Sequence, residues 1–90
     1  MPSQYDVCST QVSVTIAEGS IIWTNSRNNE CTVSEPTGQP WPFAQSSYVV
    51  AANGSTQASL KSGVQAGSYP FVCTCCPSAG PMSGRVIIIT

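Results

Sequence analysis

Residues 69–77 read Tyr69-Pro70-Phe71-Val72-Cys73-Thr74-Cys75-Cys76-Pro77, and Met82, Gly84 and Val86 follow within ten residues. The first five residues of this stretch predict a short β-strand. Pro70 has no N–H to donate, so we expect it at the start of the strand or at an unpaired position. Three of the five cysteines of the chain gather at the end of the strand. Such a cluster predicts either disulfide bonds or a metal site.

Short strand patterns recur on the amino-terminal side of this stretch, and one more follows it. Val12, Val14 and Ile16 alternate with Ser13 and Thr15, the period of a half-buried strand. The predicted strands cover residues 12–16, 21–24, 31–34, 48–52, 56–60, 69–73 and 85–89. No segment has both the period and the caps of a helix. Seven or eight short strands predict an all-β fold, an antiparallel Greek-key β-sandwich or barrel, formed by residues 1–90 as a single domain.

The composition excludes several classes of function. Charged residues make up 8% of the 90 residues, against about 25% in an average protein. The three cations, Arg27, Lys61 and Arg85, are too few and too scattered to neutralise a phosphate backbone, so we expect no nucleic-acid partner. The longest apolar run, residues 86–89, is too short to span a membrane. The chain has no histidine, which excludes Ser-His-Asp triads and imidazole ligands, and we expect no enzymatic activity.

The cysteine content also predicts a location. A chain of this size buries a small core and depends on additional stabilisation. Five cysteines and few charges favour an oxidising, extracytoplasmic compartment, either periplasmic or secreted. Met1 is followed directly by Pro2 and Ser3, so we expect an export signal to have been removed before this point.

The carboxyl-terminal segment resembles that of the cupredoxins, the plastocyanin-like blue-copper proteins. Their last two strands carry Tyr-x-Tyr/Phe-x-Cys-x-x-His-Pro, then Met, then Gly-x-Val. The matching residues here are Tyr69, Phe71, Cys73, Pro77, Met82, Gly84 and Val86. Upstream, Val14-Thr15-Ile16, Gly19 and Trp23-Thr24-Asn25 resemble the strands that lead to the first copper histidine of the family. The resemblance covers most of residues 12–89, is weakest in residues 35–60, and implies a cupredoxin-like fold.

The two histidine positions of the family hold cysteine in this chain, Cys31 and Cys76. Cys73 and Met82 match the thiolate and the axial thioether of the family. The resemblance therefore implies a metal site formed by Cys31, Cys73, Cys76 and Met82. Three thiolates and a thioether are soft ligands that favour Cu(I). The expected function is metal holding or delivery, or electron transfer of an atypical kind, with a redox or metal-exchange protein as partner.

The second hypothesis is a metal-free, disulfide-stabilised structural or interaction module on the same fold. In an oxidising compartment the cysteines pair, and copper is then absent. The resemblance brings Cys31 near Cys73 and Cys76, and Cys8 is a candidate partner for Cys75. Because five cysteines form at most two bridges, one thiol is left over or pairs with another chain.

Two further metal or redox interpretations remain open. Cys73 and Cys76 have the Cys-x-x-Cys spacing of dithiol enzymes, although they follow a strand and not a helix N-terminus. The same spacing suits zinc if Cys31 or Cys8 provides a further ligand. Glu30, beside Cys31, is a candidate oxygen ligand or a group that supports the site.

Two other segments have alternative interpretations. Asn53-Gly54-Ser55 predicts a turn and is also an N-glycosylation sequon. Trp41 and Phe43 lie in a proline-rich segment, where we expect them to cover the core. The alternatives are that they cap the metal end or form a contact patch.

Overall fold

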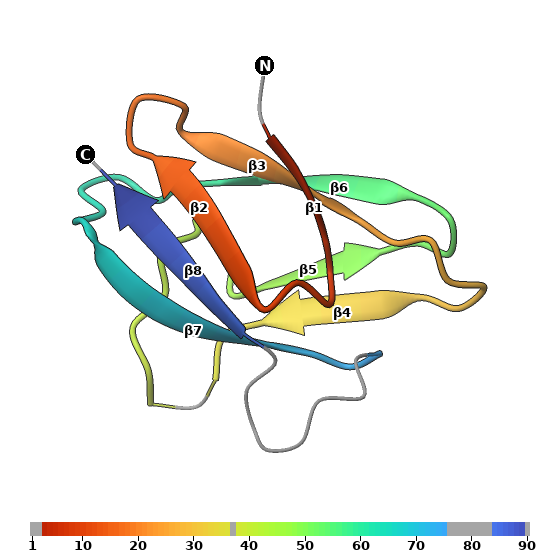
Figure 1. Cartoon of the computed structure of the whole chain (residues 1–90). Helices are drawn as coiled ribbons and strands as arrows, with labels where there is room; N and C mark the ends of the chain where they lie inside the picture. Colours follow the sequence, from red (N-terminus) through yellow and green to blue (C-terminus); the bar gives the residue numbers. More distant parts are fainter. Residues whose placement is uncertain (1–2, 37, 76–83, 90) are drawn as a thin grey trace.

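The computed structural model describes residues 3–36, 38–75 and 84–89, and all of its regular elements are strands (Figure 1). They are β1 (Ser3–Asp6), β2 (Gln11–Thr15), β3 (Ser20–Thr24), β4 (Cys31–Ser34), β5 (Ser47–Val50), β6 (Ser55–Ser59), β7 (Gly67–Cys73) and β8 (Gly84–Ile89). Within these ranges no helix is long and apolar enough to cross a membrane.

The strands form two sheets that pack face to face. One sheet has the order β1-β3-β6 and the other has the order β2-β8-β7-β4-β5. Figure 1 shows the smaller sheet lying across the larger one. The all-β sandwich expected from the sequence is therefore confirmed.

The expectation that the sandwich is antiparallel is wrong for two of its strand pairs. β1 pairs with β3 and β2 pairs with β8 in parallel, whereas the other pairs are antiparallel. The two parallel pairs arise because the short connection between β1 and β2 passes from one sheet to the other. Strands that are consecutive in the chain but lie in different sheets do not form a hairpin, so each is free to pair with a distant strand.

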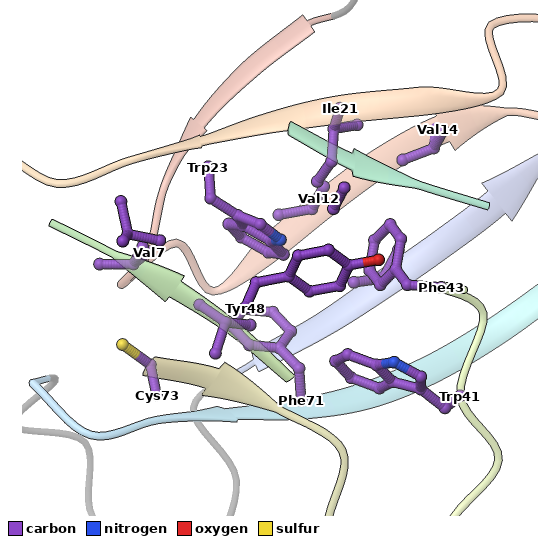
Figure 2. Packing of buried hydrophobic residues seen from close by; sticks show 14 of the residues in the cluster. Val7, Val12, Val14, Ile21, Trp23, Trp41, Phe43, Tyr48, Phe71 and Cys73 are labelled. Carbon is purple, nitrogen blue, oxygen red and sulfur yellow. The ribbon is translucent and has the colours of Figure 1, made fainter. Parts of the chain in front are cut away.

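The core between the sheets is built from alternating residues of the strands. Val12 and Val14 of β2 and Val86 of β8 are completely buried. Trp23 of β3 lies at the centre, 5.1 Å from the ring of Phe71 and 6.2 Å from that of Phe43 between centroids (Figure 2). Aromatic pairs at such distances add to the burial of apolar surface as a source of stability.

The proline-rich segment between β4 and β5 is part of this core. Trp41 and Phe43 are 5% and 2% exposed, and their rings meet edge to face at 5.4 Å. The indole N–H of Trp41 donates to the Gln45 carbonyl at 2.6 Å, which fixes the turn of the segment. The expectation that these two rings cover the core is confirmed.

Pro70 occupies a position where a missing N–H has no cost. It lies opposite Arg85 in the β7–β8 pair, and the Arg85 N–H donates to Thr10 on the opposite side. The nitrogen of Pro70 therefore faces the side of β4, whose pairing with β7 ends at Val72. The position is unpaired, as expected for a proline inside a strand.

Candidate functional site

The register between β4 and β7 brings two cysteines together. Val33 pairs with Cys73, and the ladder continues as the Thr74 N–H donates to the Thr32 carbonyl at 3.1 Å. The Thr32 N–H donates in turn to the Thr74 hydroxyl at 3.0 Å. One further step along this antiparallel register places Cys31 directly opposite Cys75.

Cys31 and Cys75 form a disulfide bond, with their Cα atoms 5.4 Å apart. This separation is ordinary for a disulfide, so the strands need no displacement to accommodate it. The bond joins residues 44 positions apart and fastens the start of β4 to the end of β7. Cys31 is completely buried, whereas Cys75 is half-buried. An external reagent therefore reaches the sulfur of Cys75 more easily than that of Cys31.

The segment between β3 and β4 wraps around the accessible sulfur. The Asn29 side-chain amide lies 3.5 Å from Cys75 Sγ, and the Glu30 carbonyl oxygen lies 3.2 Å from it. Glu30 thus contributes its backbone at this point, while its side chain is exposed.

The observed pairing corrects the expected one. Cys31 pairs with neither Cys73 nor Cys76, and Cys8 does not pair with Cys75. The reason is the register, because Cys73 lies opposite Val33 and so is two residues away from the position facing Cys31. Cys8 is nevertheless disulfide-bonded as well.

Asn25 holds the segment before Cys31 in place. It is 2% exposed, and its Nδ2 lies 2.9 Å from the Asn29 carbonyl and 3.2 Å from the carbonyls of Val50 and Ala51. Its Oδ1 accepts the Arg27 N–H at 3.0 Å. One buried side chain thus joins the β3–β4 segment to the end of β5. Such a network is rigid when its polar groups are satisfied.

An ion pair fastens the end of β1 to the same segment. Arg27 donates to both carboxylate oxygens of Asp6, at 3.0 and 3.2 Å, and Asp6 also accepts the Cys8 N–H at 2.9 Å. The hydrogen bond from Arg27 is the main reason that the pKa of Asp6 is lowered, burial opposes it, and the hydrogen bond from the Cys8 N–H lowers the pKa further. The same pair raises the pKa of Arg27, to which the neighbouring Cys73 adds a smaller electrostatic contribution.

The structure describes two of the four predicted metal ligands, Cys31 and Cys73. Cys31 is a half-cystine, and Cys73 is a buried thiol at the edge of the hydrophobic cluster (Figure 2). Cys76 and Met82 lie outside the described residues. The set of four therefore stays a prediction.

The donor chemistry of the described part does not fit a metal ion. Among residues 3–36, 38–75 and 84–89, no three cysteine or carboxylate side chains form a group that could hold one. Because the sulfur of Cys31 is bonded to that of Cys75, it is not a thiolate, and disulfide sulfur is a poor ligand. Cys31 and Cys8 are equally unsuited to be the further zinc ligand while they are oxidised.

The fold was compared with solved structures. Two forms of amicyanin match over 97% of this chain and 81% of theirs, both methionine-to-alanine mutants described as Cu(I) forms. Their TM-scores are 0.65 and 0.63, at 17% and 16% sequence identity. The chain has a cupredoxin-like fold. No protein-family model and no curated protein matches the sequence.

Sequence reasoning missed three residues that shape this end of the molecule. Cys75 was expected to pair elsewhere, and the roles of Asn25 and Thr74 were not anticipated. The sequence did contain an indication that Cys75 lies on the side of the strand that Cys73 occupies, because residues two apart share a face of an extended chain. The disulfide therefore includes Cys31, the residue that the resemblance predicts to be a metal ligand.

Proposed function

We propose that this chain is a metal-free, disulfide-stabilised cupredoxin-fold module that acts outside the cytoplasm as a structural or interaction domain. The observation that carries the proposal is the bond between Cys31 and Cys75. A sulfur atom that is bonded to another sulfur cannot at the same time serve as a thiolate ligand, so disulfide formation and metal binding compete for Cys31.

The remaining polar groups at this end support a structural role. Asp6 is engaged by Arg27 and by the Cys8 N–H, and Asn25 is saturated with backbone partners. Glu18 lies elsewhere, where it accepts the N–H and the hydroxyl of Thr15 in the turn after β2. None of these groups is placed as an acid, a base or a nucleophile of a reaction, which supports a non-catalytic function.

Disulfide bonding supports the proposed location. Bonds such as Cys31–Cys75 persist in the periplasm or outside the cell and are reduced in most cytosols. Bridging distant positions of a 90-residue chain supplies stability that a small core alone lacks.

The experiment is a thiol count on the protein purified without reductant and denatured, combined with its intact mass and metal content. We expect one thiol per chain, from Cys73, and no bound metal. Three or more thiols with one metal ion per chain would overturn the proposal.

A second candidate function is Cu(I) binding by the reduced protein. It is favoured by the position of the disulfide two register steps from Cys73, so that two-electron reduction would place thiols at Cys31 and Cys75 near a third. Its test is a Cu(I) titration against a colorimetric chelator, with oxidised and dithiol-reduced protein compared. Tight binding of one Cu(I) after reduction alone supports this candidate, and no competition in either form excludes it.

A further inference from the structure

The turn between β5 and β6 presents an asparagine in an unusual backbone conformation. Asn53 has a φ of 55°, in the left-handed region that asparagine adopts more readily than most residues. The Gly54 N–H donates to the Ala51 carbonyl at 2.9 Å and closes the turn. Asn53 and Ser55 are both exposed, so the sequon Asn53-Gly54-Ser55 lies on the surface, in the turn that leads from β5 in one sheet to β6 in the other.

The backbone of this turn is fixed while the side chain of Asn53 projects outward. The Asn53 N–H donates to the Arg27 carbonyl at 3.0 Å, and the Gly54 carbonyl accepts the Asn25 N–H at 2.9 Å. The side-chain amide makes a long contact of 3.4 Å with Asn28 Oδ1, and this contact is itself exposed. The nucleophilic nitrogen therefore lies at the surface, where a transferase could reach it.

The disulfide bonds of the protein indicate a compartment in which N-glycosylation of Asn53 is possible. An Asn-x-Ser sequon is an acceptor only where the chain is exported, and the disulfide bonds point to such a route. In this respect the inference rests on the proposed extracytoplasmic function.

We infer that Asn53 is an acceptor for an N-linked glycan that stands beside the Cys31–Cys75 disulfide. In the reaction Asn53 Nδ2 forms a bond to C1 of the sugar of a lipid-linked oligosaccharide. The bond between C1 and the lipid phosphate oxygen breaks, the lipid phosphate leaves, and one amide proton passes to the base of the transferase. No electrons are exchanged.

The contacts of Asn28 and Asn29 place a glycan on Asn53 close to the disulfide. Asn28 contacts the Asn53 amide, and the next residue, Asn29, contacts Cys75 Sγ. A glycan on Asn53 would thus shield the more accessible sulfur of the disulfide from large reductants and would restrict protein docking at this end.

The test is secretion of the full chain, behind an export signal, from a yeast that performs N-glycosylation. We expect the intact mass to exceed that of the polypeptide by one glycan and to fall when an amidase removes the glycan. Asn53→Gln and Ser55→Ala should each abolish the increase, whereas the control Asn28→Gln should retain it. A secreted wild-type protein without glycan, or a glycan that survives in Asn53→Gln, would overturn the inference.

The thiol count on the same material separates this inference from the proposed function. An unmodified secreted protein with one thiol per chain would refute the glycan alone. A glycoprotein with three or more thiols and a bound metal would refute the proposed function alone.

Discussion

Cys31 and Cys75 face each other across the extended register of β4 and β7, with their Cα atoms 5.4 Å apart and their sulfurs bonded. The fold is similar to that of amicyanin, whose two matching forms are described as Cu(I) forms. A disulfide between two strands can replace the stabilisation that a bound metal gives, because the bond restricts the unfolded chain whereas a metal binds the folded one.

The disulfide should account for much of the stability of the domain. Replacing both residues, as in Cys31→Ala/Cys75→Ala, should lower the free energy of unfolding by about 2–4 kcal/mol, since the bond closes a long loop of the unfolded chain. Urea unfolding measures this change. The single variants should each cost nearly as much as the double variant, because either one removes the whole bond. Losses that simply add would contradict a direct bond between the two residues.

Asn25 should be the most sensitive polar side chain near the disulfide. Asn25→Ala leaves the carbonyl of the buried residue Val50, and that of Ala51 beside it, without their amide partner, and we expect a loss of about 1–3 kcal/mol. Asn28→Ala is the control, because Asn28 is exposed, and should change the free energy of unfolding by less than about 0.5 kcal/mol. Equal effects of the two substitutions in urea unfolding would show that the Asn25 network is dispensable.

The ion pair between Asp6 and Arg27 should give the protein an acid-sensitive component of stability. The pKa of Asp6 is lower in the folded state, so the pair stabilises the fold above the unfolded pKa of about 3.9. This contribution disappears as the pH falls through the folded pKa. Asp6 is 40% exposed, and solvent screening therefore limits the effect to below about 1 kcal/mol.

The comparison of wild type with Asp6→Asn between about pH 5 and pH 2 measures this component. We expect the unfolding free energy of the wild type to fall more steeply with acid, and the difference between the proteins to shrink at high salt. Parallel pH profiles would show that Arg27 does not stabilise the ionised Asp6.

Gly84 should tolerate no side chain. A Cβ at this position would lie 2.6 Å from the Ser9 carbonyl oxygen and 2.7 Å from that of Thr10, and both are backbone atoms. Gly84→Ala must therefore displace the start of β2, and we expect a loss of about 3 kcal/mol in thermal or urea unfolding. Gly63→Ala is the control, since Gly63 has a φ of 77° and open space around it. It should cost about 1 kcal/mol from backbone strain alone. A milder effect at Gly84 than at Gly63 would be inconsistent with the close approach of the two strands.

The strands were largely predictable because their side chains alternate. The segment 31–34 coincides with β4, and the segment 12–16 is displaced by one residue from β2 (Gln11–Thr15). The strand β1 (Ser3–Asp6) was not found from its pattern, because its four residues include a single apolar one, Tyr5. It forms through parallel pairing with β3, which a local pattern does not encode.

The disulfide was less predictable than the fold. The segments that hold Cys31 and Cys75 are 44 residues apart, and the register between β4 and β7 is set by packing of the whole core. A shift by one residue would turn Cys31 to the other face of its strand, and a shift by two would place it opposite Cys73. Sequence could therefore indicate that sulfur atoms gather at this end, and only the structure specifies which two are bonded.

Disulfide mapping of the protein purified without reductant is the most direct test of this account. Proteolysis under non-reducing conditions, followed by mass spectrometry, should yield a linked pair of peptides that contain Cys31 and Cys75. Separate peptides in which Cys31 is a thiol, or a peptide that links Cys31 to Cys73 or Cys76, would contradict it.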